Sequence, residues 1–150
     1  MRDLFNRIKR AALLAPQVAT DDTDLVSGIV SRIGYESTVI EIDTGTLADA
    51  AAVFSVKVEH GDDPALADAA TVDAADLQLD AALSATPEAG FQAAFDQAAD
   101  NKRIAIGYLA GKGYVKVTVS PVGNAANAPL SASVLLSHAR HQPAGATQVP

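Results

Sequence analysis

The sequence predicts an all-β protein, mainly antiparallel, with the fold of a small β-sandwich or barrel. The strongest hydrophobic periodicity is two residues, which is typical of strands with one buried face. The alternating runs are rich in β-branched residues, and short segments containing Gly, Pro or Asn separate them. The chain has 150 residues and is 49% hydrophobic, which suits one compact domain with its own core.

Five runs carry the alternation, at 38–43, 53–59, 103–108, 114–119 and 132–137. Within each run every second residue is apolar, so these residues share one face of the strand. We expect this face to point into the core. The predicted inward set is Ile40 and Ile42; Phe54, Val56 and Val58; Ile104, Ile106 and Tyr108; Val115, Val117 and Val119; Ala132, Val134 and Leu136.

Weaker signals predict further strands and turns. We expect a sixth strand around 25–33, and the alternation of Leu77 and Leu79 predicts a short edge strand. The Gly-containing segment 109–113 joins two alternating runs, which predicts an antiparallel hairpin. Half-buried antiparallel strands of this kind favour a sandwich or a small barrel.

One short helix is expected, around 87–99. Thr86 suits the N-cap, Pro87 suits the first helical position, and Glu88 places an acid in the first turn. Three residues then follow at helical spacing, namely Phe91, Phe95 and Ala98.

The formal net charge of −7 is divided unevenly along the chain. Residues 1–20 carry +3, residues 21–100 carry −15 and residues 101–150 carry +5. Together with the alternating runs and the lack of periodicity after residue 137, this division predicts three parts: an N-terminal basic arm at 1–20, a β-domain at 21–137 with an acidic insertion at 60–100, and an extended C-terminal tail at 138–150.

The N-terminal arm is the predicted partner-binding site. It mixes apolar and basic side chains that suit an acidic, partly apolar surface. These residues are Leu4, Phe5, Arg7, Ile8, Lys9 and Arg10. A helix this short is marginal in water, so we expect the arm to be ordered only when it is docked. Charge interrupts its apolar part, so we do not expect a signal peptide.

Catalytic motifs are absent from the sequence, and we expect neither enzyme activity nor a cofactor. The chain has no Cys, which excludes disulfides, thiolate metal sites and a cysteine nucleophile. The sequence contains no Walker loop, no GxSxG motif and no HExxH motif, and no GxGxxG motif follows a predicted strand. The run at 107–113 has the wrong spacing for a phosphate loop, and the segment after it is a predicted strand.

His138 and His141 form an HxxH pair that, with His60, offers a weak alternative of metal binding. In an extended chain, residues three apart point to opposite sides, so no metal site is the stronger expectation. We predict instead that His138, Arg140 and His141 contact a subunit or a partner. The acidic clusters at 21–24 and 62–63 lack the EF-hand pattern, which favours solvated loops over calcium sites.

Binding to nucleic acid and to membranes is not expected. The chain is net acidic and has few aromatic residues on which bases could stack. No stretch of about 18 apolar residues is present to span a bilayer.

The order of several segments is similar to a family of small structural proteins encoded near the head genes of tailed bacteriophages. The chain begins MRDLFNRI, continues with SGIVSRIGYESTVIEIDTGTL and FSVKVEHGDD, and later contains GYLAGKGYVKVTVSP and ASVLLSHARHQP. The resemblance covers most of the chain and is weakest at 60–100. None of its segments is a catalytic signature.

The resemblance implies a virion component on the exterior of the capsid, most simply a capsid decoration (cement) protein. Such proteins are small, often β-rich and frequently trimeric, so the implied partners are the major capsid protein and further copies of this chain in a homotrimer. Two alternatives remain open. One is a neck, tail-completion or tail-tube protein, and the other is a module that binds surface glycans.

Overall fold

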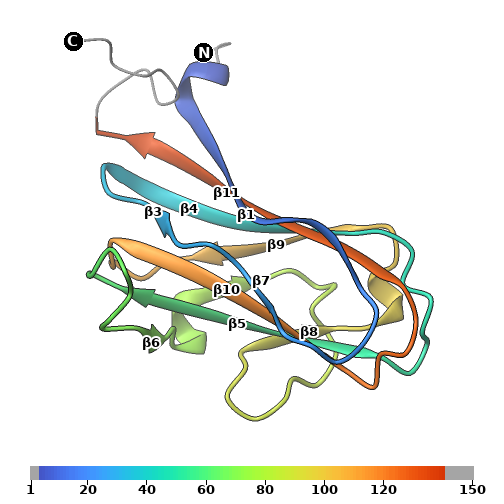
Figure 1. The fold of residues 1–150 in the computed structure, drawn as a ribbon. Coiled ribbons are helices and arrows are strands. Elements are labelled where there is room, and N and C mark those ends of the chain that lie inside the picture. Colours follow the sequence, from blue (N-terminus) through green and yellow to red (C-terminus); the bar gives the residue numbers. More distant parts are fainter. Residues whose placement is uncertain (1–3, 141–150) are drawn as a thin grey trace.

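The computed structural model describes residues 4–140, which form two antiparallel β-sheets packed as a sandwich without a closed barrel (Figure 1). The five-stranded sheet A has the order β1 (Ile8–Ala19), β11 (Ala128–Ala139), β4 (Tyr35–Thr44), β9 (Arg103–Tyr108) and β7 (Leu77–Leu79). Sheet B has the order β2 (Leu25–Val26), β10 (Tyr114–Val122), β5 (Val53–Gly61) and β6 (Ala70–Thr71). Two further strands also belong to it: β3 (Val30–Ser31) pairs with β10, and β8 (Ala93–Phe95) pairs with β5. Three short 3₁₀ turns complete it: η1 (Phe5–Arg7), η2 (Ala74–Asp76) and η3 (Gln97–Ala99).

The predicted all-β sandwich is confirmed, and the five alternating runs lie in β4, β5, β9, β10 and β11. Every residue of the predicted inward set is buried. The two sheets place these side chains against one another, so the core is a layer of Ile, Val and Leu with few aromatic rings. The sixth strand expected at 25–33 is divided into β2 and β3, both paired with β10.

The basic N-terminal segment begins with η1 and continues as β1, which pairs with β11 along the edge of sheet A. The register of this pairing shifts between Ala12 and Leu14 and again before Gln17, and both shifts are β-bulge irregularities. The first shift lets two consecutive residues, Leu13 and Leu14, both enter the core. Residues 8–19 are therefore extended, as an arm would be, but they form a strand of the sandwich.

The acidic segment 60–100 contributes strands to both sheets. Its β6 and β8 add to sheet B, and its β7 adds to sheet A. The edge strand predicted from Leu77 and Leu79 is confirmed as β7, which pairs with β9.

The helix predicted over 87–99 is wrong. Gly90 has a positive φ of 89°, and residues 93–95 form β8, which pairs with β5. Phe95 is fully buried against Phe54, with ring centroids 5.1 Å apart. A strand at this edge of sheet B buries Phe95 more completely than one face of a short isolated helix, and this tertiary packing overrides the N-cap signal.

The hairpin predicted at 109–113 is also wrong. Strand β9 pairs with β4 and β7, whereas β10 pairs with β5, β2 and β3, so the connection crosses from one sheet to the other. Both strands still bury their alternating apolar faces, because those faces meet across the sandwich.

Candidate partner-binding ridge

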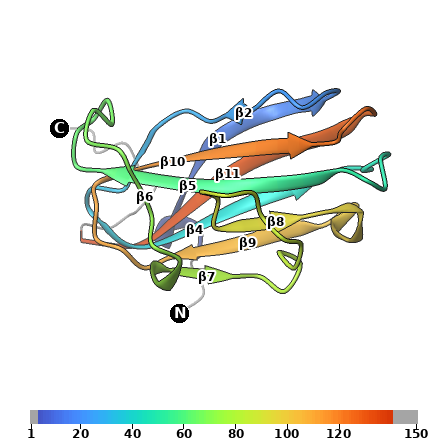
Figure 2. The same ribbon diagram turned by 90° about the horizontal axis from the view of Figure 1, so that it is seen from below.

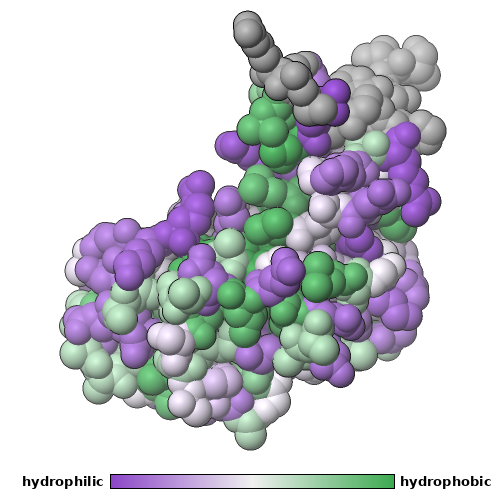
Figure 3. Space-filling model, turned by 180° about the vertical axis from the view of Figure 1, so that it is seen from behind, coloured by the Kyte–Doolittle hydropathy of each residue, from purple (hydrophilic) through white to green (hydrophobic). Residues whose placement is uncertain are grey.

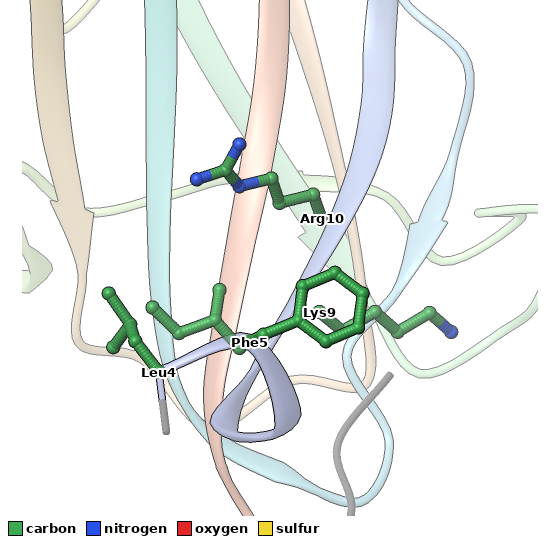
Figure 4. Close-up of a pocket in the computed structure, with 5 residues that line it drawn as sticks. Leu4, Phe5, Lys9 and Arg10 are labelled. Carbon is green, nitrogen blue, oxygen red and sulfur yellow. The ribbon is translucent and has the colours of Figure 1, made fainter. Parts of the chain in front are cut away.

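The six residues predicted as the partner-binding arm lie together at one end of the molecule, where η1 leads into β1 (Figure 1). Figure 4 shows four of them, Leu4, Phe5, Lys9 and Arg10. We call Leu4–Arg10 the ridge. A hydrogen bond from the Arg7 N–H to the Leu4 carbonyl, 3.1 Å long, closes its 3₁₀ turn. The ridge presents large apolar side chains to solvent, since Leu4 is 65% and Phe5 is 87% exposed.

Two grooves flank the ridge. One has a volume of about 480 Å³ and is lined by Leu4, Phe5, Ile8, Lys9 and Arg10. The other has a volume of about 510 Å³ and is lined by Leu4, Arg7, Ile8, Glu36 and the segment 137–140. Leu4 and Ile8 line both grooves, so they form an apolar crest between two hollows. Figure 3 shows hydrophobic side chains gathered at this end and continuing onto the face below it.

The ridge is strongly basic. Arg7, Lys9 and Arg10 are exposed, and none of them belongs to an ion pair within residues 4–140. The Lys9 ammonium lies 5.9 Å from the centroid of the Tyr35 ring, a cation–π contact that holds it beside β4. Glu36 is the acidic residue among the described residues that line the grooves. The site therefore offers apolar contact together with uncompensated positive charge.

The structure brings two of the three predicted C-terminal contact residues to the same site. His138 and Arg140 are exposed and line the second groove, and His141 lies outside the described residues. His138 has a φ of 52°, in the left-handed region, and its Nδ1 lies 3.2 Å from the Ser137 hydroxyl. The Arg140 N–H donates to the Gly34 carbonyl at 2.9 Å, which fixes the end of β11 beside the start of β4.

A buried arginine that the sequence did not single out supports the base of this site. Arg32 is 8% exposed, and its guanidinium donates to the Thr38 hydroxyl (3.1 Å) and the Lys112 carbonyl (2.9 Å). Two longer bonds reach the carbonyls of Tyr35 and Glu36, both 3.4 Å. Arg32 thus ties the 109–113 connection to the first residues of β4, including the residue that borders the second groove. Its planar fork suits this convergence of acceptors.

Beside Arg32, a hydrogen bond joins the two sheets. The Tyr108 hydroxyl lies 2.9 Å from Nδ1 of His60 and accepts from the Lys112 N–H at 3.2 Å. Burial, aided by the nearby Lys112 ammonium, lowers the pKa of His60, which favours the neutral imidazole beside the Tyr108 hydroxyl. Burial also raises the pKa of Tyr108, which keeps its hydroxyl protonated.

The acidic loops use their carboxylates to close turns. Asp21 accepts from the Thr23 N–H at 2.8 Å, and Asp68 accepts from the N–H groups of Asp62 and Asp63 at 2.8 and 3.1 Å. Hydrogen bonds from the Thr23 side chain and then from its N–H lower the pKa of Asp21, and the two N–H bonds lower the pKa of Asp68. Between residues 4 and 140, the structure contains no group of three or more His, Cys, Asp or Glu side chains that could hold a metal ion.

The fold and this site define a β-sandwich protein that carries an exposed apolar and basic ridge at one end of an edge strand. Compared with protein-family models and with curated proteins, the chain matches neither a family model nor a relative. Across the described part of the chain, no helix is long and apolar enough to cross a membrane.

Proposed function

We propose that this chain is a bacteriophage virion structural protein, a capsid decoration protein that binds the outer surface of the mature head through the ridge and stabilises the shell. The observation that carries the proposal is the exposure of Leu4 and Phe5 between two grooves on an otherwise well-packed sandwich. Exposed apolar patches rimmed by polar residues are typical of protein–protein interaction sites.

The chemistry of the ridge fits an acidic, partly apolar partner. Phe5 and Leu4 supply area that becomes buried on docking, and Arg7 and Arg140 supply charges for carboxylates on the shell. One copy that binds through so small a contact is expected to bind weakly. Linked copies on a shell of many identical sites raise the overall affinity through avidity.

The test is co-sedimentation with mature heads that lack their decoration protein. Deletion through residue 14 is unsuitable, because it removes Leu13 and Leu14 from the core. We expect the variant Leu4→Ser/Phe5→Ser to lose at least 10-fold in binding, while the wild-type chain saturates the heads.

The matched control is Val26→Ser, which changes a side chain that is 56% exposed but lies away from the ridge. It is expected to bind like the wild type. Equal binding by the ridge variant and the wild type would overturn the proposed use of the ridge. Failure of the wild-type chain to bind heads would overturn the decoration role itself.

A second candidate is a ring-forming neck, tail-completion or tail-tube protein. It is favoured by the exposed edges of sheet A, where β1 and β7 are the terminal strands. Copy number per virion distinguishes the two roles, since hundreds of copies indicate decoration and six or twelve copies indicate a ring at the neck or tail.

A further inference from the structure

Sheet A has two open edges, which lie on opposite sides of the molecule (Figure 2). At the β1 edge, the only described backbone bond from outside sheet A is that from the Gly28 N–H to the Leu13 carbonyl, 3.0 Å long. The part of β1 before Leu13 therefore has main-chain groups that face outward from β11 without a partner in residues 4–140. At the other edge, β7 pairs with β9 alone, and Gln78 and Leu79 are exposed. Such edges are templates for pairing with another chain.

The open parts of the two edges lie at the same level of the sheet. Following the register strand by strand, Leu79 is opposite Ile106, Ile106 opposite Ile40, Ile40 opposite Val134, and Val134 opposite Ala11. In the same way Leu77 leads across the sheet to Lys9. Adjacent strands of sheet A are all antiparallel, so the first and the fifth strands, β1 and β7, run in the same direction.

This geometry determines which symmetry suits the edges. When one copy is rotated about an axis along the strands, its β1 comes beside the β7 of the next copy without a shift along the axis. A head-to-tail contact without such a shift closes into a ring where its rotation is a whole fraction of a turn, whereas a shift along the axis produces an open helical filament.

The charges of the two edges are opposite. The segment 7–12 at the β1 edge contains three bases and no acid, namely Arg7, Lys9 and Arg10. The segment 73–80 at the β7 edge contains three acids and no base, namely Asp73, Asp76 and Asp80. Within the described residues none of the six belongs to an ion pair. Two β1 edges brought together would place like charges side by side, so pairing between the unlike edges is favoured.

We propose that copies of this chain associate head to tail, with residues 8–12 of β1 adding as a parallel strand beside β7 of the next copy, so that sheet A continues around a closed ring. The occupant of each edge is a second copy of the chain. The contact uses the backbone of β1 and the charges of Lys9 and Arg10, and it leaves Leu4 and Phe5 exposed. It is a property of the free protein and does not depend on shell binding.

Cysteine cross-linking tests the pairing directly, because the chain contains no Cys. Ala11→Cys and Leu79→Cys place thiols on residues that the register puts at the same level. When the two single variants are mixed and oxidised, we expect disulfide-linked heterodimers and few homodimers. The chain carrying both substitutions is expected to give covalent oligomers that end at one closed size.

The matched control replaces Ala11→Cys with Val18→Cys, an exposed position on the same strand that pairs with Pro129 and so lies far from the level of Leu79. It is not expected to link with Leu79→Cys. Homodimers of Ala11→Cys in excess would show two-fold pairing of β1, and the absence of heterodimers would exclude the edge contact. Either result overturns the proposal.

Charge exchange provides a second measurement that does not need cysteine. By sedimentation velocity, Arg10→Glu and Asp80→Arg are each expected to weaken self-association at least 10-fold, and the chain carrying both changes is expected to recover it. In about 1 M salt, where the Debye length is about 3 Å, association of the wild type should weaken as well. A wild type that remains monomeric at low salt, or a double variant that does not recover, would contradict the proposal.

Discussion

The two ends of the sandwich are closed by different chemistry. At the end below the ridge, the Tyr108–His60 hydrogen bond and the Arg32 guanidinium fill the space between the sheets with polar groups. At the opposite end, Phe54 and Phe95 stack with ring planes 11° apart. The comparison shows that one end is held by apolar burial. The other end is held by hydrogen bonds that involve a titratable group, His60, and backbone carbonyls distant in the sequence.

The aromatic end carries the largest expected single contribution to stability. Phe95→Ala would leave a cavity beside Phe54 and is expected to lower the free energy of unfolding by about 4 kcal/mol. Urea unfolding followed by far-UV circular dichroism measures this loss. Phe91→Ala is the matched control, because Phe91 is only half-buried beside Lys57, and its loss is expected to be less than half as large. Equal losses would contradict the comparison.

At the polar end, Arg32→Met is expected to lower the free energy of unfolding by about 2 kcal/mol, since the carbonyls of Lys112, Tyr35 and Glu36 lose a donor. The same denaturant titration measures the effect. Arg103→Met serves as its control, because Arg103 forms an exposed pair with Asp43 and should change stability little. A larger effect from Arg103 would show that surface pairing, and not the buried fork, stabilises sheet A.

His60 makes the polar end sensitive to pH. Burial lowers the pKa of His60 below its ordinary 6.5, so below that pH the unfolded chain binds more protons than the folded one. Stability from this group is complete above pH 6.5 and declines as the pH falls from 6.5 toward the lowered pKa. The carboxylates Asp62 and Asp68 have pKa values lowered from 3.8, so their contribution is lost only at more acidic pH.

Urea midpoints measured at intervals between pH 7.5 and pH 5 test this dependence, with the range chosen to separate His60 from the carboxylates. In His60→Asn the side-chain amide can donate to or accept from the Tyr108 hydroxyl without titrating, so its midpoint should vary less over the same range. A slope unchanged in His60→Asn would assign the pH dependence to other groups.

The sequence was sufficient to predict the parts of the fold that rest on alternation. The buried faces of β4, β5, β9, β10 and β11 follow from period two and β-branched residues, and each is an intrinsic property of a short segment. The edge strand at Leu77 and Leu79 was predictable for the same reason.

The features that the sequence did not predict depend on long-range partners. The N-cap signal at Thr86 and Pro87 is local, whereas β8 forms because β5 offers an edge and Phe54 offers a ring. A short Gly-containing loop suits both a hairpin and a crossing between sheets, and only the pairing of β9 with β4 distinguishes them. Arg32 was overlooked because its partners are mostly backbone carbonyls, which have no sequence signature.

The ridge was predicted as a site, but its continuation into strand β1 was not. Bulges place Leu13 and Leu14 in the core, although both residues follow directly after a basic segment. The segment therefore has two parts: residues 4–7 precede the strand and are exposed, whereas β1 pairs with β11 and places Leu13 and Leu14 in the core.

The smallest expected effect on stability therefore comes from the most exposed part of the ridge. Leu4→Ser/Phe5→Ser should shift the free energy of unfolding by less than about 0.5 kcal/mol, because these side chains are largely exposed. Leu14→Ala on the same strand, which empties a core position, should cost about 3 kcal/mol and serves as the contrasting variant. Urea unfolding of both variants gives the comparison. A large loss in the ridge variant would show that the ridge belongs to the core, and any binding defect it caused would then follow from unfolding and not from a lost contact.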